Sequence, residues 1–311
     1  MDKGNGKEDT TYFESDFDSV EELEENGKKV AEQLHTEGAV LLKNNEVLPL
    51  KKDAKVSTLS HSSVDMVTCG TGAADIDTSN APTLKEALES RGVSVNSTLW
   101  DFYTKGAGKE YVRTPGKEAN QENQSGRAGW HINEVPASAY TNEVKSSFAQ
   151  YKDAAIVTIS RISGEGSDLA VDEFKDGKNV LSLTAEEQEY VKMAKSNLKR
   201  NCLINSTNAL ECDFIDNEEY GIDAVLWIGY TGGWGLNGVA DILVGNANPS
   251  GRLVDTYCYD NTTTPSMESI YGADYTNYDP KDEEHWYSVA NGQLDGNHHY
   301  ITYQGRYLCR I

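Results

Sequence analysis

The chain has 311 residues, 38% hydrophobic and 25% charged, a composition that fits a globular protein with a buried core. It carries 28 basic and 50 acidic residues, which gives a formal net charge of −22. Nucleic acids and anionic membranes are bound by basic faces, so we expect neither nucleic acid nor a membrane contact as a partner. The sequence does not fix the compartment; it favours a secreted or cell-surface protein whose targeting segment is absent from this chain.

Cysteine and histidine give no sign of a metal or a disulfide framework. The five cysteines are odd in number and form no C-x-x-C pair. The adjacent His298 and His299 have no acidic or cysteine partner at ligand spacing. We therefore expect no metal and no cofactor.

The first half of the chain contains recognisable helix and strand signals. Residues 1–18 are polar and acidic and are expected to form a flexible lead-in. Ser19 and Glu22 make a capping-box pattern that predicts a helix. Apolar residues follow it at helical spacing: Leu23, Val30, Ala31 and Leu34.

Further along this half, the patterns predict a strand over 56–59, a helix capped by Thr83 and Glu86, and a short strand over 93–95. Residues 104–138 hold glycine, proline and asparagine with few aliphatic residues. We expect a long loop or insertion there, and loops of that length tend to be functional or disordered.

From residue 153 on, predicted strands alternate with predicted helices. The strands are expected at 154–159, 202–205 and 224–228, and the helices after Thr184, around 209–215 and near 236–243. This alternation is typical of βαβ units. It predicts an α/β fold, a mostly parallel sheet flanked by helices over 19–260, followed by an irregular acidic tail over 261–311.

One glutamate stands out in this pattern. Glu165 lies between Gly164 and Gly166, just past the predicted strand 154–159. Loops that follow parallel strands meet at one edge of the sheet, which is where ligands of open α/β sheets bind. We expect Glu165 there among hydroxyls, glycines and Trp234, a set better suited to a sugar than to a phosphate.

Two other motifs carry weaker hypotheses. The segment 70–75 resembles part of the G-x-G-x-x-G nucleotide fingerprint but lacks its last glycine, so a nucleotide-binding protein is a poor alternative. His61 and Ser62 could suggest a serine hydrolase, but no G-x-S-x-G elbow is present.

Three segments together resemble one family. They are Glu37–Asn44 running to Leu50, the loop Ser163–Asp168, and the run from Asp241 to Gly245 followed by Asn248–Leu253. In order and spacing they resemble the α/β-sandwich domain, the C-terminal-type domain, of family 3 glycoside hydrolases, the β-glucosidase group. The residue after Leu253 departs from the family pattern, because valine stands where proline is usual.

The resemblance implies a retaining glycosidase with two carboxyl groups, one a nucleophile and one an acid/base. Glu165 matches the acid/base glutamate. Arg161, Asp168 and Trp234 are expected to form the substrate-binding surroundings, with Asp168 ordering the loop. The expected substrate is a β-linked glucoside or oligosaccharide.

The resemblance also implies that half of the active site is absent. The family's nucleophile is an aspartate on a (β/α)₈ barrel, which takes about 250 residues. No such segment stands beside the sandwich here, so we expect a barrel on the same natural polypeptide and little activity from the chain alone. The alternative is a non-catalytic carbohydrate-binding or scaffold module of the same fold.

Overall fold

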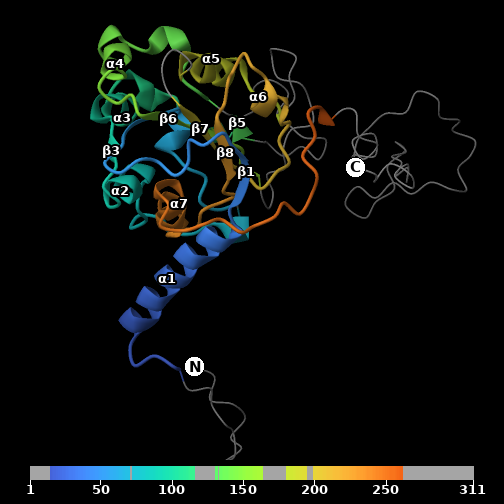
Figure 1. The fold of residues 1–311 in the computed structure, drawn as a ribbon. Coiled ribbons are helices and arrows are strands. Elements are labelled where there is room, and N and C mark those ends of the chain that lie inside the picture. Colours follow the sequence, from blue (N-terminus) through green and yellow to red (C-terminus); the bar gives the residue numbers. More distant parts are fainter. Residues whose placement is uncertain are drawn as a thin grey trace, which may run out of the picture.

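The computed structural model describes residues 15–70, 72–115, 130–131, 133–163, 180–194 and 199–261. In these residues a six-stranded sheet runs through the centre of the molecule, with helices on both faces (Figure 1). The spatial order is β1-β8-β7-β6-β2-β3. The strands are β1 (Val40–Asn44), β2 (Lys55–Leu59), β3 (Ser94–Val95), β6 (Ala154–Ser160), β7 (Arg200–Asn205) and β8 (Ala224–Trp227).

Every strand pair of this sheet is parallel except β1 with β8. The predicted α/β fold with a mostly parallel sheet is therefore confirmed. The antiparallel edge strand β1 is an addition that the sequence patterns did not assign to a sheet. Two further strands, β4 (Thr114–Pro115) and β5 (Trp130–His131), form a separate antiparallel pair within the expected insertion.

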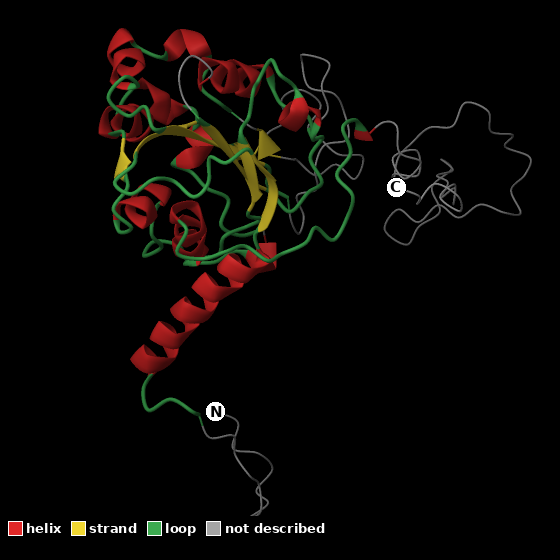
Figure 2. Cartoon of the chain, viewed as in Figure 1, coloured by secondary structure: helices red, strands yellow, loops and turns green. Residues whose placement is uncertain are grey.

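Helices lie on both sides of the sheet (Figure 2). The two faces of the sheet carry separate hydrophobic cores. On β6, Ala155, Val157 and Ile159 pack into one core, and Ala154 and Ile156 into the other. All seven residues of β6 are buried, as expected of a central parallel strand covered on both faces.

The helices divide between these two cores. The first is covered by α3 (Ser97–Thr104), α4 (Asn142–Ser147), α5 (Ala185–Met193) and α6 (Asp213–Asp216). The second is covered by α2 (Leu84–Glu89) and α7 (Gly235–Val244). Among the described residues, no helix combines the length and the apolar character needed to cross a bilayer.

Most predicted elements are present close to their expected bounds. Complete capping boxes begin α2 at Thr83 and α5 at Thr184, and Gly245 ends α7 with a φ of 82°. The helix expected around 209–215 was placed wrongly, since α6 has only four residues. The backbone N–H groups of Glu211 and Cys212 donate instead to carbonyl groups of Leu181 and Cys258, which keeps this stretch out of a helix.

The first helix, α1 (Val20–Gly38), begins at Ser19 as predicted and extends from the body of the domain (Figure 1). It packs on α7 through a polar face. Glu32 accepts a hydrogen bond from Asn237 at 2.7 Å, and the His35 ring lies 3.0 Å from the carbonyl oxygen of Tyr230. Its large aliphatic side chains are instead exposed, at 66%, 50%, 46% and 64% for Val20, Leu23, Val30 and Leu34.

Exposure of this apolar face predicts that it contributes little to the stability of the domain. Leu34→Ala should change the free energy of unfolding by less than about 0.5 kcal/mol. Leu88→Ala, the matched change at a fully buried position of α2, should cost about 2–5 kcal/mol, because it leaves a cavity in the core. Urea unfolding compares the two, and a loss above about 2 kcal/mol from Leu34→Ala would contradict the exposed position.

Candidate active site

One side chain at the carboxyl edge of the sheet connects the loop after β2, the end of β6 and the loop after β8. Asn205, at the end of β7, is completely buried. Its Oδ1 accepts hydrogen bonds from the Val67 N–H at 2.6 Å and from the Ser160 hydroxyl at 2.8 Å. Its Nδ2 donates to the carbonyl oxygens of Val67 at 2.9 Å and Gly229 at 2.7 Å. Both donors and both acceptor lone pairs of the amide are therefore used.

A buried carboxylate holds the loop after β2. Glu134 accepts from the backbone N–H groups of His61 at 2.7 Å and Ser62 at 3.0 Å, and from the Ser62 hydroxyl at 2.6 Å. The Ser62 hydroxyl is thus bound to a carboxylate and not to the neighbouring imidazole. This geometry excludes the nucleophile–base pair that a serine hydrolase requires. Burial raises the pKa of Glu134 to about 7, although the bonds from Ser62 and His61 oppose the shift.

Arg161 follows β6 and is buried completely. Its guanidinium binds both carboxylate oxygens of Glu187, at 2.7 and 2.8 Å. The remaining donors bind the carbonyl oxygens of Ser160, Val180 and Ser182. All five N–H groups are therefore satisfied inside the protein.

These contacts correct the expectation that Arg161 binds substrate, because it has no free donor and no exposed surface. Its contacts join the residues before position 164 to those after position 179. Arg161 therefore fixes both ends of the segment that carries Glu165.

Glu165 and Asp168 themselves lie outside the described residues. The residue nearest to them that the structure describes is Ser163. Its backbone N–H donates to the Tyr230 hydroxyl at 3.0 Å, and its hydroxyl donates to Asn208 Oδ1 at 3.2 Å. The loops after β6, β7 and β8 thus contact one another at Ser163, two residues before Glu165. The sequence predicts Glu165 at this same carboxyl edge of the sheet.

Trp234 lies immediately before α7, in the loop after β8. The Nζ atom of Lys28 on α1 lies 4.6 Å from the centre of its ring, a cation–π distance. The ring of Trp234 therefore has an ammonium group over it.

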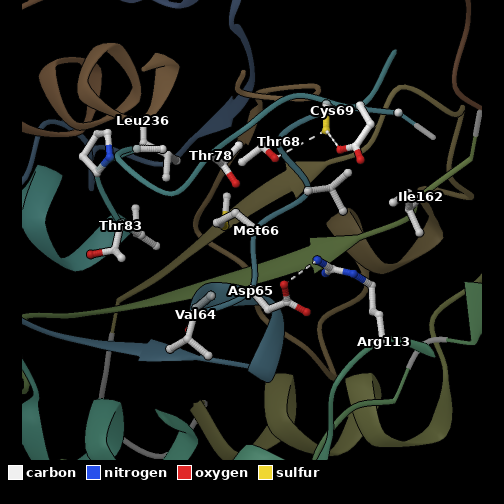
Figure 3. A pocket seen from close by; sticks show the side chains of 17 residues that line it. Val64, Asp65, Met66, Thr68, Cys69, Thr78, Thr83, Arg113, Ile162 and Leu236 are labelled. Carbon is white, nitrogen blue, oxygen red and sulfur yellow. Dashed lines mark hydrogen bonds and ion pairs between the residues drawn. The ribbon is translucent and has the colours of Figure 1, made fainter. Parts of the chain in front are cut away.

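A cavity of about 590 Å³ opens at the same edge (Figure 3). Its described lining comes from five parts of the chain: residues 63–70, residues 75–84, Arg113 just before β4, Ile162 just after β6, and Leu236 in the first turn of α7. The lining includes Asp65, Asp75, Thr78, Arg113, Ile162 and Leu236. A volume of this size lies in the range of small-molecule sites.

Arg113 gives this cavity its strongest polar feature. Its Nη2 lies 3.0 Å from Asp65 Oδ1, and its side chain is only 10% exposed. Its Nη1 is buried and has no hydrogen-bond partner among the described residues.

The sequence analysis did not single out Arg113, although it lies within the predicted long loop 104–138, and it missed Glu134 altogether. No local pattern marks either residue, because their partners lie far away in the chain.

The geometry defines an α/β sandwich with a ligand-sized cavity at the carboxyl edge of its parallel strands. A family model described as the Glycosyl hydrolase family 3 C-terminal domain matches residues 39–296. The match covers more than half of the chain, so the chain belongs to this family, and the resemblance drawn from the sequence motifs is confirmed.

Several of the similar proteins are named β-glucosidases. The beta-glucosidase of Ruminococcus albus is 30% identical over 252 residues, which cover 80% of this chain and 25% of that protein. Beta-glucosidase A of Butyrivibrio fibrisolvens is 30% identical over 286 residues, covering 82% and 33%. The structure of beta-glucosidase 3B from Thermotoga neapolitana in complex with α-D-glucose superposes with a TM-score of 0.63 at 26% identity, covering 78% and 32%. The chain thus spans a quarter to a third of the length of these relatives.

The raised pKa of Glu134 predicts a pH-dependent stability. The folded protein keeps this proton to about pH 7, whereas the ordinary value for the group is 4.5. The contribution of Glu134 to the free energy of unfolding is therefore fully present below pH 4.5 and is lost as the pH rises toward 7. Glu134→Gln, which has no proton to release, should give a flatter dependence of the unfolding free energy across this window.

Urea unfolding at several pH values measures these slopes. Glu110→Gln, at an exposed carboxyl that is 74% accessible, is the control and should keep the slope of the unaltered protein. Parallel curves for the unaltered protein and Glu134→Gln would contradict the raised pKa.

Proposed function

We propose that this chain is the acid/base half of a retaining β-glycosidase that hydrolyses β-glucosides. The observation that carries the proposal is the family membership of the domain together with the position of Ser163. This residue is held by Tyr230 and Asn208 at the carboxyl edge of the sheet, two residues before Glu165. Two relatives that are 30% identical to the chain are named β-glucosidases.

In the proposed reaction, Glu165 donates its proton to the glycosidic oxygen as the bond from that oxygen to the sugar breaks. A carboxylate on the second half of the enzyme forms a bond to the sugar carbon at the same time. In the second step, Glu165 takes a proton from water, and the water oxygen displaces the carboxylate. Each step conserves charge and needs no cofactor.

The two carboxyl groups of a retaining site lie about 5–5.5 Å apart, so the second half must cover the edge that carries Glu165. We propose that this half is a (β/α)₈ barrel of the same natural polypeptide. Its docking would remove water from Glu165 and raise the pKa of that carboxyl, as a general acid needs near neutral pH. Asp168 and Trp234 are proposed to surround the sugar, whereas Arg161 is proposed to hold the loop.

The proposal predicts that the chain alone does not hydrolyse an aryl β-glucoside, because it lacks the nucleophile. The chain joined to a family barrel should hydrolyse it, and Glu165→Gln should lower the rate by about 10²–10⁴-fold. Glu110→Gln is the matched control and should leave the rate unchanged. A chromogenic assay of all four proteins measures this.

Hydrolysis by the chain alone that Glu165→Gln abolishes would contradict the half-site, because a nucleophile would then lie within these residues. Sugar binding by the joined protein without any hydrolysis would favour the alternative, a carbohydrate-binding module of the same fold.

A further inference from the structure

Two cysteines lie on segments of the chain that contact each other directly, far from the Glu165 loop in sequence. Cys212 comes just before α6, and Cys258 belongs to the extended segment that follows α7 and is described to residue 261. Both are free thiols. The backbone N–H of Cys212 donates to the carbonyl oxygen of Cys258 at 2.8 Å. Residues joined by such a bond have Cα atoms about 5–6 Å apart, within the range of about 4.4–6.8 Å that a disulfide spans.

The alignment of these two segments does not depend on that one hydrogen bond. The backbone N–H of Asn261 donates to Glu211 Oε1 at 3.0 Å. The Tyr259 hydroxyl donates to Asp216 Oδ2 at 2.6 Å. Contacts beyond both sides of the cysteine pair therefore hold the segment after α7 against the stretch that leads into α6.

The two thiols differ in their access to solvent. Cys258 is partly exposed, whereas Cys212 is only 4% exposed. Burial and the nearby charges of Asp213 and Cys258 raise the pKa of Cys212 to about 12. A reagent in solution therefore reaches Cys258 first, and Cys212 is the neighbouring thiol that can react with the product.

Neither thiol is held strongly in its present orientation. Cys212 Sγ donates to the carbonyl oxygen of Leu210 at 3.4 Å, and Cys258 Sγ donates to that of Thr256 at 4.0 Å. A thiol is a weak hydrogen-bond donor, so turning the two side chains toward each other breaks only weak contacts.

We infer that Cys212 and Cys258 are a redox-sensitive pair that a small disulfide oxidant, such as oxidised glutathione, converts to a disulfide bond. The Cys258 sulfur loses its proton and bonds to one sulfur of the oxidant, and the S–S bond of the oxidant breaks to release one glutathione. The Cys212 sulfur then loses its proton and displaces the second glutathione from Cys258. The two cysteines lose two protons and two electrons, which reduce the oxidant to two thiols. This inference is independent of the proposed function.

The disulfide would clamp the segment after α7 onto the body of the domain. It closes a loop of about 45 residues, and a cross-link of this kind stabilises the fold mainly by restricting the unfolded chain. The clamp lies beside Glu211, whose carboxylate accepts from Asn261 and from the Ser182 hydroxyl. Ser182 in turn accepts from Arg161 through its carbonyl oxygen. Oxidation would therefore secure the surroundings of the contacts that fix the returning end of the Glu165 segment.

The test treats the chain with oxidised glutathione in mildly alkaline buffer, which favours the reactive thiolate. We expect the loss of two of the five free thiols and a cross-link between Cys212 and Cys258. After the remaining thiols are alkylated, a protease that cleaves after glutamate identifies the cross-link by mass. Glu211 and Glu218 flank Cys212, so the peptide 212–218 contains no other cysteine.

Thermal unfolding measures the consequence of the bond. The oxidised chain should have a Tm higher by about 5 °C, and dithiothreitol should reverse the change. Cys258→Ser should abolish both the cross-link and the rise in Tm. Cys69→Ser is the matched control, since Cys69 is also a partly exposed free thiol but contacts Thr68 and Asp75 instead of a cysteine. It should leave both results unchanged.

Four results would overturn the inference. They are oxidation without any cross-link, a stable mixed disulfide with glutathione at Cys258, a cross-link from either cysteine to one of the other three, and a rise in Tm that Cys258→Ser retains. The cross-link is detected in the unaltered chain, so the first three results do not depend on the folding of a variant.

Discussion

The geometry of the candidate active site, at the carboxyl edge of the sheet, depends on the hydrogen bonds of the Asn205 side-chain amide. It is buried at the end of β7, and its four hydrogen bonds reach the loop after β2, the end of β6 and the loop after β8. A fully satisfied buried amide fixes the geometry around it, because any displacement leaves donors or acceptors without partners. The parallel sheet brings the strand ends together, and Asn205 sets the relative positions of the loops that leave them.

Arg161 and Glu187 extend this constraint to the segment that carries Glu165. Glu187 has two roles: it completes the capping box of α5 with Thr184 and it binds Arg161 with both oxygens. Burying these charges is costly unless every donor and acceptor is used. All five donors of Arg161 are used. The buried ion pair therefore holds together the two chain segments that flank residues 164–179.

The sequence predicted well those features that depend on neighbours in the chain. The capping boxes at Thr83 and Thr184, the αL glycine at Gly245 and the continuous apolar strand β6 are local patterns, and all four are present. The helix around 209–215 was misplaced because the backbone of Glu211 and Cys212 bonds to distant carbonyl groups. Motif resemblance identified the family, which composition and periodicity could not have done.

The site residues that the sequence analysis missed or misassigned share one property: their hydrogen-bond partners lie far away in the sequence. Arg161 was expected at the substrate, yet its partners Glu187 and Ser182 lie more than 20 positions away and bury it. Glu134 meets Ser62 from 72 positions away. Contacts of this kind are created by the sheet topology, and no spacing rule along the chain indicates them.

The central claim is that Glu165 on this domain protonates the leaving group. It is tested most directly by comparing two aryl β-glucosides in the enzyme completed by its barrel, one with phenol and one with dinitrophenol as leaving group. Phenol needs a proton to depart, whereas dinitrophenol departs as a stable anion. The account predicts that Glu165→Gln slows kcat/KM for the phenyl glucoside far more than for the dinitrophenyl glucoside. Equal slowing of both substrates would contradict it, because Glu165 would then act on something other than proton donation to the leaving oxygen.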